Sequence, residues 1–541
     1  MRVSTSQWAW GTSAHWRLYH SLKLFRKKWL GSIANETFVD NSKNNVHGKR
    51  HSTVNLRPVG HHKKRKTGYN FRRSSSSAYI HSKVSDNLLS DKEVNQKLWS
   101  NEKNVALKSE KIVRCETNQL ASNEPNEDQL FMTKSKSNDS VLVGVIDGHG
   151  GSLFGVQTKQ RLPYYLHAAL IDNSVHCNNN DFQPSDLFDN VLNKDAVSEN
   201  LPWFKDINSY LNDSRDNIDL NSSAGNILSY VSSPLKQLFA TGNTDENQIP
   251  LNFGVSQAIK EAFLRLDTDM ISEMKYLADS NQMNTHNLGV ALSGCCALVA
   301  YLVHDELYVA NLGDCRAVLG SYCNGNWSAV QLTYDHTAAS SPEEIQRILS
   351  EHPADETRSC IQYGRLLGRL APLRALGDVQ FKLSASELGD MFKTLPKFSP
   401  MQNLKTPPYL SAEPDVFHYK LEKSDRFIVL ASDGLWDMLD NEEVIELVAA
   451  YLEGRRSEKL QERAHLYGVA NCDAILADPN AFKDSEDENI ASFLIRFALA
   501  GYDRNNLRAM MSLSYPDVRL YRDDISVAVI FLENDDGNMV S

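Results

Sequence analysis

Several short apolar runs of this chain lie directly beside an aspartate, and this recurring arrangement limits the folds that the chain can adopt. The run at residues 141–146 is followed by Asp147, and the run at 426–431 is followed, after one serine, by Asp433. Asp523 lies just before the run at 525–532. Short β-branched and apolar runs bounded by turn-forming residues are typical of buried strands. We therefore expect strands whose ends carry carboxylates.

Other patterns predict a mixture of strands and helices. Residues 297–303 and 306–311, separated by His304-Asp305, are typical of a hairpin, and 316–319 predict the next strand. Apolar residues at three- and four-residue steps across 258–274 predict an amphipathic helix. A second helix is predicted at 442–452. Asp440 is its expected N-cap, Glu443 lies three residues later, and Gly454 is the expected stop.

Three stretches between these elements are interpreted as insertions: residues 173–250, 384–408 and 455–487. The first is crowded with Asn, Asp and Ser, and the other two show weak periodicity. Loops of this length in a compact domain are usually functional or disordered. We therefore expect one catalytic domain over residues 78–535 that contains these insertions, followed by a short C-terminal tail at 536–541.

The first 83 residues differ in charge from the rest of the chain. They contain 17 Lys and Arg but only 2 Asp and Glu, although the whole chain has a net charge of −11. Residues 1–35 are basic, hydroxylated and free of acids, which is the composition of a mitochondrial transit peptide. A second basic cluster at 61–66 is consistent with a nuclear signal or with a solvated tail. Composition thus favours import into mitochondria, with residues 1–77 as a transit peptide or disordered basic arm.

Charge, cysteine spacing and hydropathy argue against several classes of protein. Beyond Lys83 the chain has 66 acidic and 40 basic residues, which argues against a broad nucleic-acid-binding face. The 8 cysteines form no CxxC pair, so neither a disulfide framework nor a zinc site is indicated. The longest apolar runs have about ten residues, too few to span a bilayer. We expect no nucleic-acid partner and no transmembrane segment.

Carboxylates gathered at strand ends can form a metal site. A strand end is a rigid place for a ligand, and converging carboxylates repel one another unless cations lie between them. Ligands that are all oxygen select Mg²⁺ or Mn²⁺ over zinc. Two such ions can activate a bridging water for in-line attack on phosphorus. One Asp-Gly pair after a strand is far more often a simple turn, so a single instance would not indicate this chemistry.

Five motifs together resemble the metal-dependent (type 2C) Ser/Thr protein phosphatase family. They are Asp-Gly-His-Gly at 147–150, Leu-Gly-Asp at 312–314, Ala-Leu-Gly-Asp at 375–378, Ser-Asp-Gly-Leu-Trp-Asp at 432–437 and Arg-Asp-Asp-Ile at 522–525. The resemblance runs from Arg114 to Leu532 with the motifs in the family's order. It implies an α+β fold of two packed antiparallel β-sheets flanked by helices, in α-β-β-α layers. The metals would lie in a cleft at one end of the sheets.

The resemblance also implies a role for each residue of the central motifs. Asp147 would bridge two Mg²⁺ or Mn²⁺ ions, and Gly148 would offer its backbone carbonyl to one of them. Asp433 and Asp523 would be ligands of the other ion. His149 would be the general acid that protonates the leaving serine or threonine oxygen, a task that suits the pKa of an imidazole. A lone histidine in a turn would otherwise be expected to face water.

The same resemblance implies roles for further acidic residues that lie outside the two-metal centre. Glu127 matches a glutamate that contacts the metals mostly through water. Asp314 and Asp437 match acids that hold a third, weaker metal ion. Asp128 and Asp378 are expected to contact the ligand residues rather than the metal ions themselves.

Two positions depart from the family's usual pattern. Asn123 stands where most members have an arginine that binds the substrate phosphate. Cys295 and Cys296 replace Ser and Thr in the segment that follows Ser293-Gly294. We interpret these cysteines as small buried apolar residues rather than nucleophiles, because this chemistry needs no covalent intermediate. All the metal-ligand positions are kept, which argues against an inactive relative.

Four stretches resemble one branch of the family, the catalytic subunits of mitochondrial pyruvate dehydrogenase phosphatases: residues 118–128, 365–382, 406–414 and 521–525. This resemblance implies a location in the mitochondrial matrix and a phosphoserine substrate on the dehydrogenase component of the pyruvate dehydrogenase complex. It also implies docking on the lipoyl domains of the acetyltransferase core, and a regulatory subunit. Two alternatives stay open: a related phosphatase of cytosolic or nuclear phosphoproteins, and a non-catalytic scaffold.

Overall fold

The computed structural model describes residues 88–170, 188–192, 251–453 and 487–533, apart from positions 108, 110, 137 and 502. All of these belong to one compact unit, Asn70–Ser541. The basic arm at 1–77, the tail at 536–541 and Gly454 lie outside the described residues, as do most of the stretches 173–250 and 455–487. Among the described helices, none is long and apolar enough to cross a membrane.

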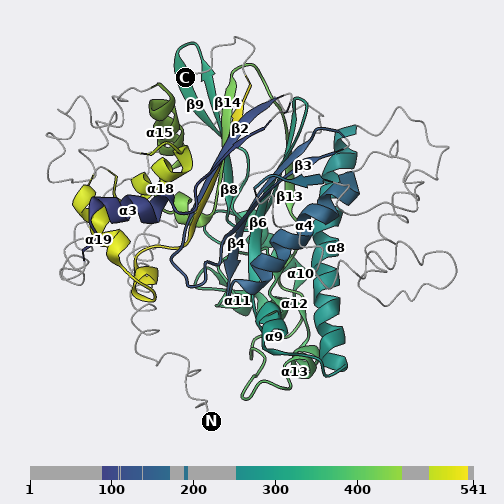
Figure 1. Ribbon diagram of the computed structural model, residues 1–541. Coiled ribbons are helices and arrows are strands. Elements are labelled where there is room, and N and C mark those ends of the chain that lie inside the picture. Colours follow the sequence, from purple (N-terminus) through teal and green to yellow (C-terminus); the bar gives the residue numbers. More distant parts are fainter. Residues whose placement is uncertain are drawn as a thin grey trace, which may run out of the picture. The chain divides into compact units, whose positions relative to one another are not determined.

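Two antiparallel sheets form the centre of the domain (Figure 1). The strands of the first sheet, in spatial order, are β1 (Lys103–Ala106), β2 (Ile112–Leu120), β15 (Ile525–Leu532), β14 (Asp425–Ala431), β8 (Arg316–Cys323) and β9 (Asn326–Gln331). Those of the second sheet are β13 (Asp415–Lys420), β7 (Glu306–Leu312), β6 (Gly294–Val303), β4 (Val141–His149), β3 (Gln129–Ser135) and β5 (Phe188–Asn190). The short strand β12 (Leu376–Gly377) also pairs with β6.

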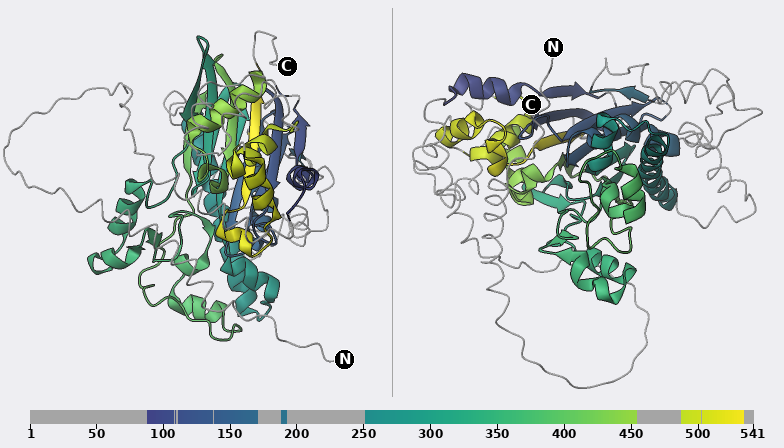
Figure 2. Two further views of the ribbon diagram at one scale, coloured as in Figure 1. Left: turned by 90° about the vertical axis from the view of Figure 1, so that its left-hand side faces the viewer. Right: turned by 90° about the horizontal axis from the view of Figure 1, so that it is seen from below.

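Helices cover the outer face of each sheet. The second sheet packs against α4 (Leu153–Leu170) and α8 (Leu251–Asp279). The first packs against α15 (Asn441–Glu453) and α18 (Ile490–Ala500). In the right-hand view of Figure 2 the yellow C-terminal helices lie on one side of the strands and the teal α8 lies on the other. This arrangement confirms the predicted α+β fold with α-β-β-α layers.

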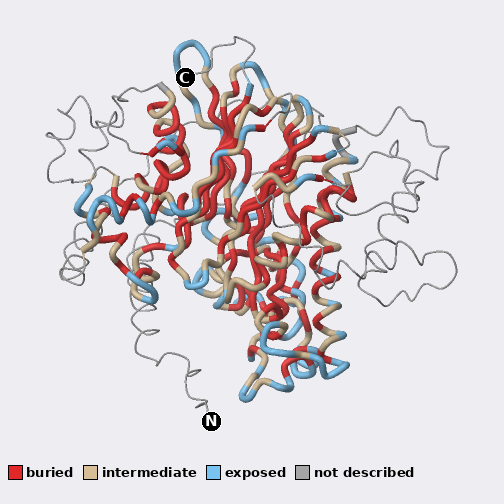
Figure 3. The backbone as a smooth tube through the Cα atoms, in the orientation of Figure 1, coloured by how far each residue is buried: buried red, intermediate tan, exposed pale blue. Residues whose placement is uncertain are grey.

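The inner faces of both sheets share one apolar core, which contains Val143 and Leu298 from one sheet and Ile428 and Ile530 from the other. Figure 3 shows the strands as mainly buried. All eight residues of β15 are buried, because one set of alternating side chains faces the helices and the other faces the second sheet. A strand covered on both faces is mainly apolar, which explains why seven of the eight residues at 525–532 are apolar.

Further elements complete the part of the chain that the structure describes. Its other helices are α3 (Asp91–Trp99), α9 (Thr285–Leu292), α10 (Pro342–Glu351), α11 (Thr357–Cys360), α12 (Val379–Lys382), α13 (Ala385–Met391), α14 (Asp433–Trp436) and α19 (Arg504–Ser512). Two 3₁₀ turns lie at η2 (Ala354–Glu356) and η3 (Asp517–Leu520), and a small hairpin joins β10 (Ile361–Gln362) to β11 (Arg365–Leu366). Residues 384–408 hold α13, whose capping box is formed by Ser384 and Glu387.

Most predicted elements are confirmed, but three strands are longer than predicted: β6 begins at Gly294 rather than at 297, β8 ends at Cys323 rather than at 319, and β4 is extended as well. The hairpin of β6 and β7 turns at His304-Asp305, and the Asp440–Glu443 capping box begins α15. Strand β4 was expected to stop at Ile146 and instead continues to His149, because its last three residues pair with β6. The turn lies at Gly150 and Gly151, whose φ angles are +72° and +129°. Asp147 therefore lies within a paired strand rather than in a turn.

Arg374 joins two elements through ion pairs with one buried and one partly exposed carboxylate, and we expect its removal to destabilise the fold. Its guanidinium lies 2.5 Å from a carboxylate oxygen of buried Glu344 in α10 and 3.0 Å from one of Asp415 in β13. Arg374→Ala should lower the free energy of unfolding by about 2–4 kcal/mol, because it leaves the buried Glu344 carboxylate with one partner fewer. Urea denaturation measures this. Lys420→Ala, which removes an exposed pair with Asp305, is the control and should lower the stability far less.

Candidate metal centre and active site

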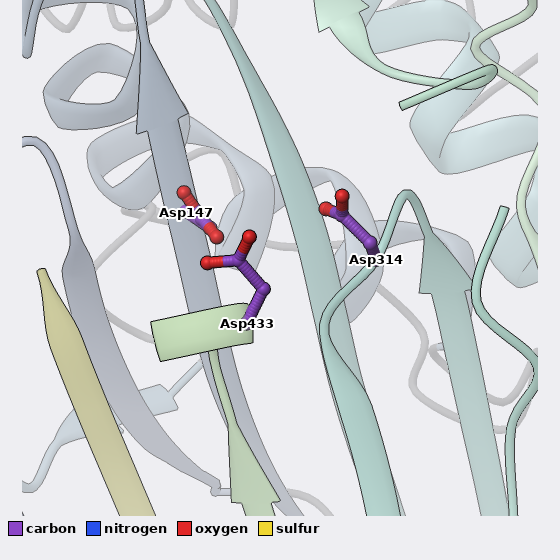
Figure 4. Close-up of side chains that lie close together, drawn as sticks. All are labelled: Asp147, Asp314 and Asp433. Carbon is purple, nitrogen blue, oxygen red and sulfur yellow. The ribbon is translucent and has the colours of Figure 1, made fainter. Parts of the chain in front are cut away.

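Three aspartates from different elements meet at one point (Figure 4). Asp147 lies in β4, Asp314 follows β7, and Asp433 is the first residue of α14. One carboxylate oxygen of each lies within 4.8 Å of those of the other two. Asp314 occupies the connection where the chain passes from the second sheet to the first, and β14 of the first sheet leads to Asp433. The cluster therefore lies where ends of both sheets meet.

The electrostatics of this cluster disfavour three ionised carboxylates. Each side chain keeps some contact with solvent, but desolvation is the largest cause that raises the pKa of Asp147 and of Asp433. The charges of neighbouring acids raise both pKa values further. Within the described ranges, none of the three aspartates forms an ion pair with Lys or Arg. The cluster thus carries repulsion that a bound cation would relieve.

The donor atoms of the cluster fit a hard divalent ion. All three side chains offer carboxylate oxygens, which Mg²⁺ and Mn²⁺ prefer, and no described histidine or cysteine joins the set. Cys296 lies beside the cluster, but its thiol only donates to Asp314 across 3.2 Å. Cys295 and Cys296 are both buried, as expected, and burial raises the pKa of the Cys295 thiol to about 12. Both cysteines therefore remain protonated.

Gly148 is required by a close approach of the backbone. A Cβ atom at this position would lie 2.4 Å from the carbonyl oxygen of Glu127. We expect Gly148→Ala to push the Glu127 loop away from β4 and to weaken metal binding about 10–100-fold, as loss of supporting contacts does at other metal sites. The increase in melting temperature with added Mn²⁺ measures the affinity. Gly389→Ala in α13, where a Cβ would meet nothing within 4 Å, should leave that affinity unchanged.

The loop that carries Glu127 is held by Asp524, a residue for which no role was predicted from the sequence. Asp524 is buried, and its carboxylate accepts hydrogen bonds from the backbone amides of Ser122, Asn123 and Glu127 over 2.5–2.9 Å. The side-chain amide of Asn123 donates to Glu127 across 2.9 Å and to Asp524 across 2.8 Å. Asn123 therefore fixes the Glu127 carboxylate in place. The signal for Asp524 was the doublet with Asp523, of which only the first member was interpreted.

Asp523 and Asp437 lie outside the closest group. Asp523 is half-exposed, pairs with Arg519 and accepts a hydrogen bond from the Asp524 amide across 2.9 Å. Its charge still raises the pKa of Asp147 and of Asp433. Asp437 is exposed and also raises the pKa of Asp433. The structure thus gathers Asp314, rather than Asp523, with the other two aspartates, and the division of these acids among individual ions stays a prediction.

Two buried acids, Asp128 and Asp378, contact residues next to the three aspartates. Asp128 is buried and accepts a hydrogen bond from the hydroxyl of Ser432, beside Asp433, across 2.8 Å. Asp378 is buried and contacts His149, with Nε2 of the ring 2.5 Å from Oδ2 of the carboxylate. Desolvation lowers the pKa of His149, but Asp378, Asp314 and Glu127 outweigh it, so the net pKa is raised. The imidazole is therefore stabilised in its protonated form, ready to donate a proton.

A second layer of contacts positions Asp378. Its backbone amide donates to the carbonyl of Ser293 across 3.1 Å. The preceding residue, Gly377, donates its amide to buried Asp267 across 2.7 Å, and the ammonium of Lys382 pairs with the same carboxylate. These contacts tie helix α8, which carries Asp267, to the residue that holds the His149 ring.

Comparisons with known proteins bear on the class of this site. Residues 231–473 match the family model described as "Protein phosphatase 2C". The human protein named "[Pyruvate dehydrogenase [acetyl-transferring]]-phosphatase 2, mitochondrial" is 33% identical over 443 residues, which are 78% of this chain and 78% of that protein. A phosphatase 1 of the same name from Rattus norvegicus is 33% identical over 437 residues, 77% of each chain. Among solved structures, serine-threonine phosphatase 2C from Toxoplasma gondii aligns with a TM-score of 0.38 and 15% identity, over 80% of this chain and 99% of that one.

Proposed function

Since this chain belongs to the protein phosphatase 2C family of Ser/Thr protein phosphatases, we propose that it dephosphorylates and so reactivates the pyruvate dehydrogenase complex in the mitochondrial matrix. The observation that carries the proposal is the identity of 33% across more than three quarters of the chain with proteins named as mitochondrial pyruvate dehydrogenase phosphatases. Two features of the sequence support it: the acid-free basic composition of residues 1–35, and the stretch at 365–382.

The family implies divalent metal ions, and the donor set described above fits them. Asp147, Asp314 and Asp433 would hold Mg²⁺ or Mn²⁺, with Glu127 and Asp523 beside them and Gly148 offering its carbonyl. Two such ions, with a third and weaker one at Asp314 and Asp437, would supply an activated water and stabilise the charge of the phosphoryl oxygens.

The chain's own residues provide the proton for the leaving group. With Nε2 of His149 engaged by Asp378, the second ring nitrogen, Nδ1, carries the proton that goes to the leaving serine oxygen. Asp378 fixes the orientation of the ring and favours its protonated form. Asn123 and Asp524 hold Glu127 in place, and the charge of Glu127 also raises the pKa of His149.

The substrate is tested by comparing two phosphoproteins. Purified protein with Mg²⁺ or Mn²⁺ should release phosphate from phosphorylated pyruvate dehydrogenase with a kcat/KM at least about tenfold above that for an unrelated phosphoserine protein, a difference of about 1.4 kcal/mol. Equal values would contradict the proposed substrate while leaving the phosphatase activity in place. The proposal includes binding to the lipoyl domains of the acetyltransferase core and to a regulatory subunit, which co-purification from mitochondria would detect.

A second candidate is a related phosphatase of cytosolic or nuclear phosphoproteins, which the basic cluster at 61–66 favours. Fusing residues 1–83 to a fluorescent protein distinguishes the two. Mitochondrial fluorescence supports the first proposal, and nuclear fluorescence without a mitochondrial signal supports the second.

A further inference from the structure

Three arginines gather around the small hairpin of β10 and β11. Arg358 lies in α11, Arg365 begins β11, and Arg369 follows the hairpin. Gln362 links the first two, since it donates to the carbonyl of Arg358 across 3.4 Å and pairs with Arg365 in the hairpin register. The guanidinium of Arg365 in turn donates to the carbonyl of Arg369 across 2.8 Å. We call residues 358–369 the arginine hairpin.

These arginines lack carboxylate partners in the part of the chain that the structure describes. Arg358 and Arg369 are exposed, and Arg365 is partly exposed. The neighbouring acids are engaged elsewhere, because Asp355 pairs with Lys405 and buried Glu356 accepts the hydroxyl proton of Tyr409. By contrast, several other arginines of the domain are paired with acids, such as Arg316 with Asp335. In a chain of net charge −11, the hairpin is thus a local positive surface that attracts anionic groups.

The tip of the hairpin presents an aromatic residue under backbone strain. Tyr363 is 72% exposed, and its φ of +54° precedes a φ of +68° at Gly364. Positive φ at both positions of a two-residue loop defines a type I′ turn, for which Asn-Gly is the preferred sequence. Tyrosine is unfavourable in this conformation, and its largely exposed ring is available for contact with a binding partner. Tyr and Arg together are enriched among residues that dominate interface energetics.

The segment that follows the hairpin borders the active site at two points. The amide of Leu373 donates to the carbonyl of His336 across 2.7 Å, and the ring of His336 accepts from the amide of Gly313, beside Asp314, across 3.1 Å. Five residues after Leu373, Asp378 contacts His149. Asp378 is nine positions after Arg369, so the length of the connecting chain limits the distance between the hairpin and Asp378 to about 30 Å.

We propose that the arginine hairpin, with Tyr363 at its tip, is a docking surface for an acidic segment of the phosphoprotein substrate. The acidic side chains would pair with the guanidinium groups of Arg358, Arg365 and Arg369. An extended peptide of about ten residues bridges the distance between hairpin and His149, so the acids belong within about ten residues of the phosphoserine. This inference takes from the proposed function only that the substrate is a phosphoprotein.

Direct binding tests the surface without any need for catalysis. A fluorescent, unphosphorylated Glu-rich peptide is titrated with full-length protein and followed by anisotropy at low salt. Arg358→Glu/Arg369→Glu should weaken its binding at least about tenfold, because charges facing across an interface reverse from attraction to repulsion. The control Lys92→Glu/Arg504→Glu makes the same change of net charge on the exposed faces of α3 and α19 and should alter binding less than about twofold. Equal weakening by both pairs, or no binding by the wild type, would overturn the proposal.

Kinetics then connect docking to turnover. With one phosphoserine core, an acidic flank should lower KM about tenfold relative to a neutral flank in the wild type, and the difference should vanish in Arg358→Glu/Arg369→Glu. Hydrolysis of para-nitrophenyl phosphate, which has no flank, should be unchanged.

Tyr363→Asn should raise KM for the acidic peptide while the melting temperature stays equal or rises. A parallel loss on para-nitrophenyl phosphate would mean a structural role and overturn docking. If no phosphate ester is hydrolysed, the proposed function fails while the anisotropy result still decides the docking surface.

Discussion

Asp433→Asn is expected to reduce kcat for phosphoserine hydrolysis by at least about 10³-fold, which corresponds to about 4 kcal/mol of lost transition-state stabilisation. Asp433 belongs to the group of three carboxylates within 4.8 Å of one another, and an amide in its place supplies a neutral oxygen with much weaker affinity for a divalent ion. The rate is measured with purified protein, a phosphopeptide and saturating Mg²⁺ or Mn²⁺. Asp390→Asn, an exposed change of the same chemistry in α13, should leave kcat unchanged.

The same substitution should stabilise the metal-free protein, which is a result that activity alone cannot give. The pKa of Asp433 is raised in the folded state, first by desolvation and then by the charges of neighbouring acids. A raised carboxyl pKa means that the ionised form opposes folding above that pKa, so removing the charge should increase the melting temperature at neutral pH in a chelator. Added Mn²⁺ should then stabilise the wild type more than Asp433→Asn. If the two proteins show the same activity and the same response to Mn²⁺, a non-catalytic scaffold becomes the better interpretation.

His149→Ala is expected to slow phosphoserine hydrolysis about 10²–10⁴-fold while affecting para-nitrophenyl phosphate far less. General acids contribute rate factors of this size when the leaving oxygen needs a proton. A serine alkoxide is a poor leaving group and needs that proton, whereas nitrophenolate is stable without one. The measurement is kcat for both substrates at the same metal concentration. Asp378→Asn should show the same selectivity to a smaller extent, because it keeps a hydrogen-bonding partner for the ring but removes the charge that favours the protonated imidazole.

An equal loss on both substrates would assign His149 a different role. It would indicate that the ring supports Asp147 or the metal ions rather than the leaving group, since those functions are shared by every ester. The response of the melting temperature to Mn²⁺ separates these cases, because a general acid can be removed without weakening metal binding.

The bounds of an element could be predicted best where the local sequence pattern allowed only one interpretation. Strand β15 has the predicted bounds 525–532, because an apolar run of eight residues that ends at turn residues leaves few alternatives. Strand β4 was predicted three residues short, since Asp147-Gly148 is a common turn and only pairing with β6 shows that the strand continues. Pairing partners more than a hundred residues away are not visible in a local pattern.

The residues of the site likewise fall into those that a local sequence pattern could predict and those that it could not. Asp147 and Asp433 could be singled out because each adjoins an apolar run. The position of Asp314 within the closest group could not, because it depends on how the connection between β7 and β8 crosses from one sheet to the other. The role of Asp524 depends on contacts with residues about four hundred positions earlier in the chain. The departure at Asn123 was visible in the sequence, but its hydrogen bonds to Glu127 and Asp524 were not.

The central place of β15 has a consequence for the order in which the domain can assemble. Residues 525–532 lie near the end of the sequence, yet β15 lies between β2 and β14 and pairs with both. Until these residues emerge from the ribosome, β2 and β14 have no shared partner, and exposed strand edges promote aggregation. The pairing of β2 with β15 also closes a loop of about four hundred residues, and long-range contacts of this kind slow folding. A nascent chain therefore exposes these strand edges until residues 525–532 have been synthesised, and Asp524 can hold the Glu127 loop only from that stage on.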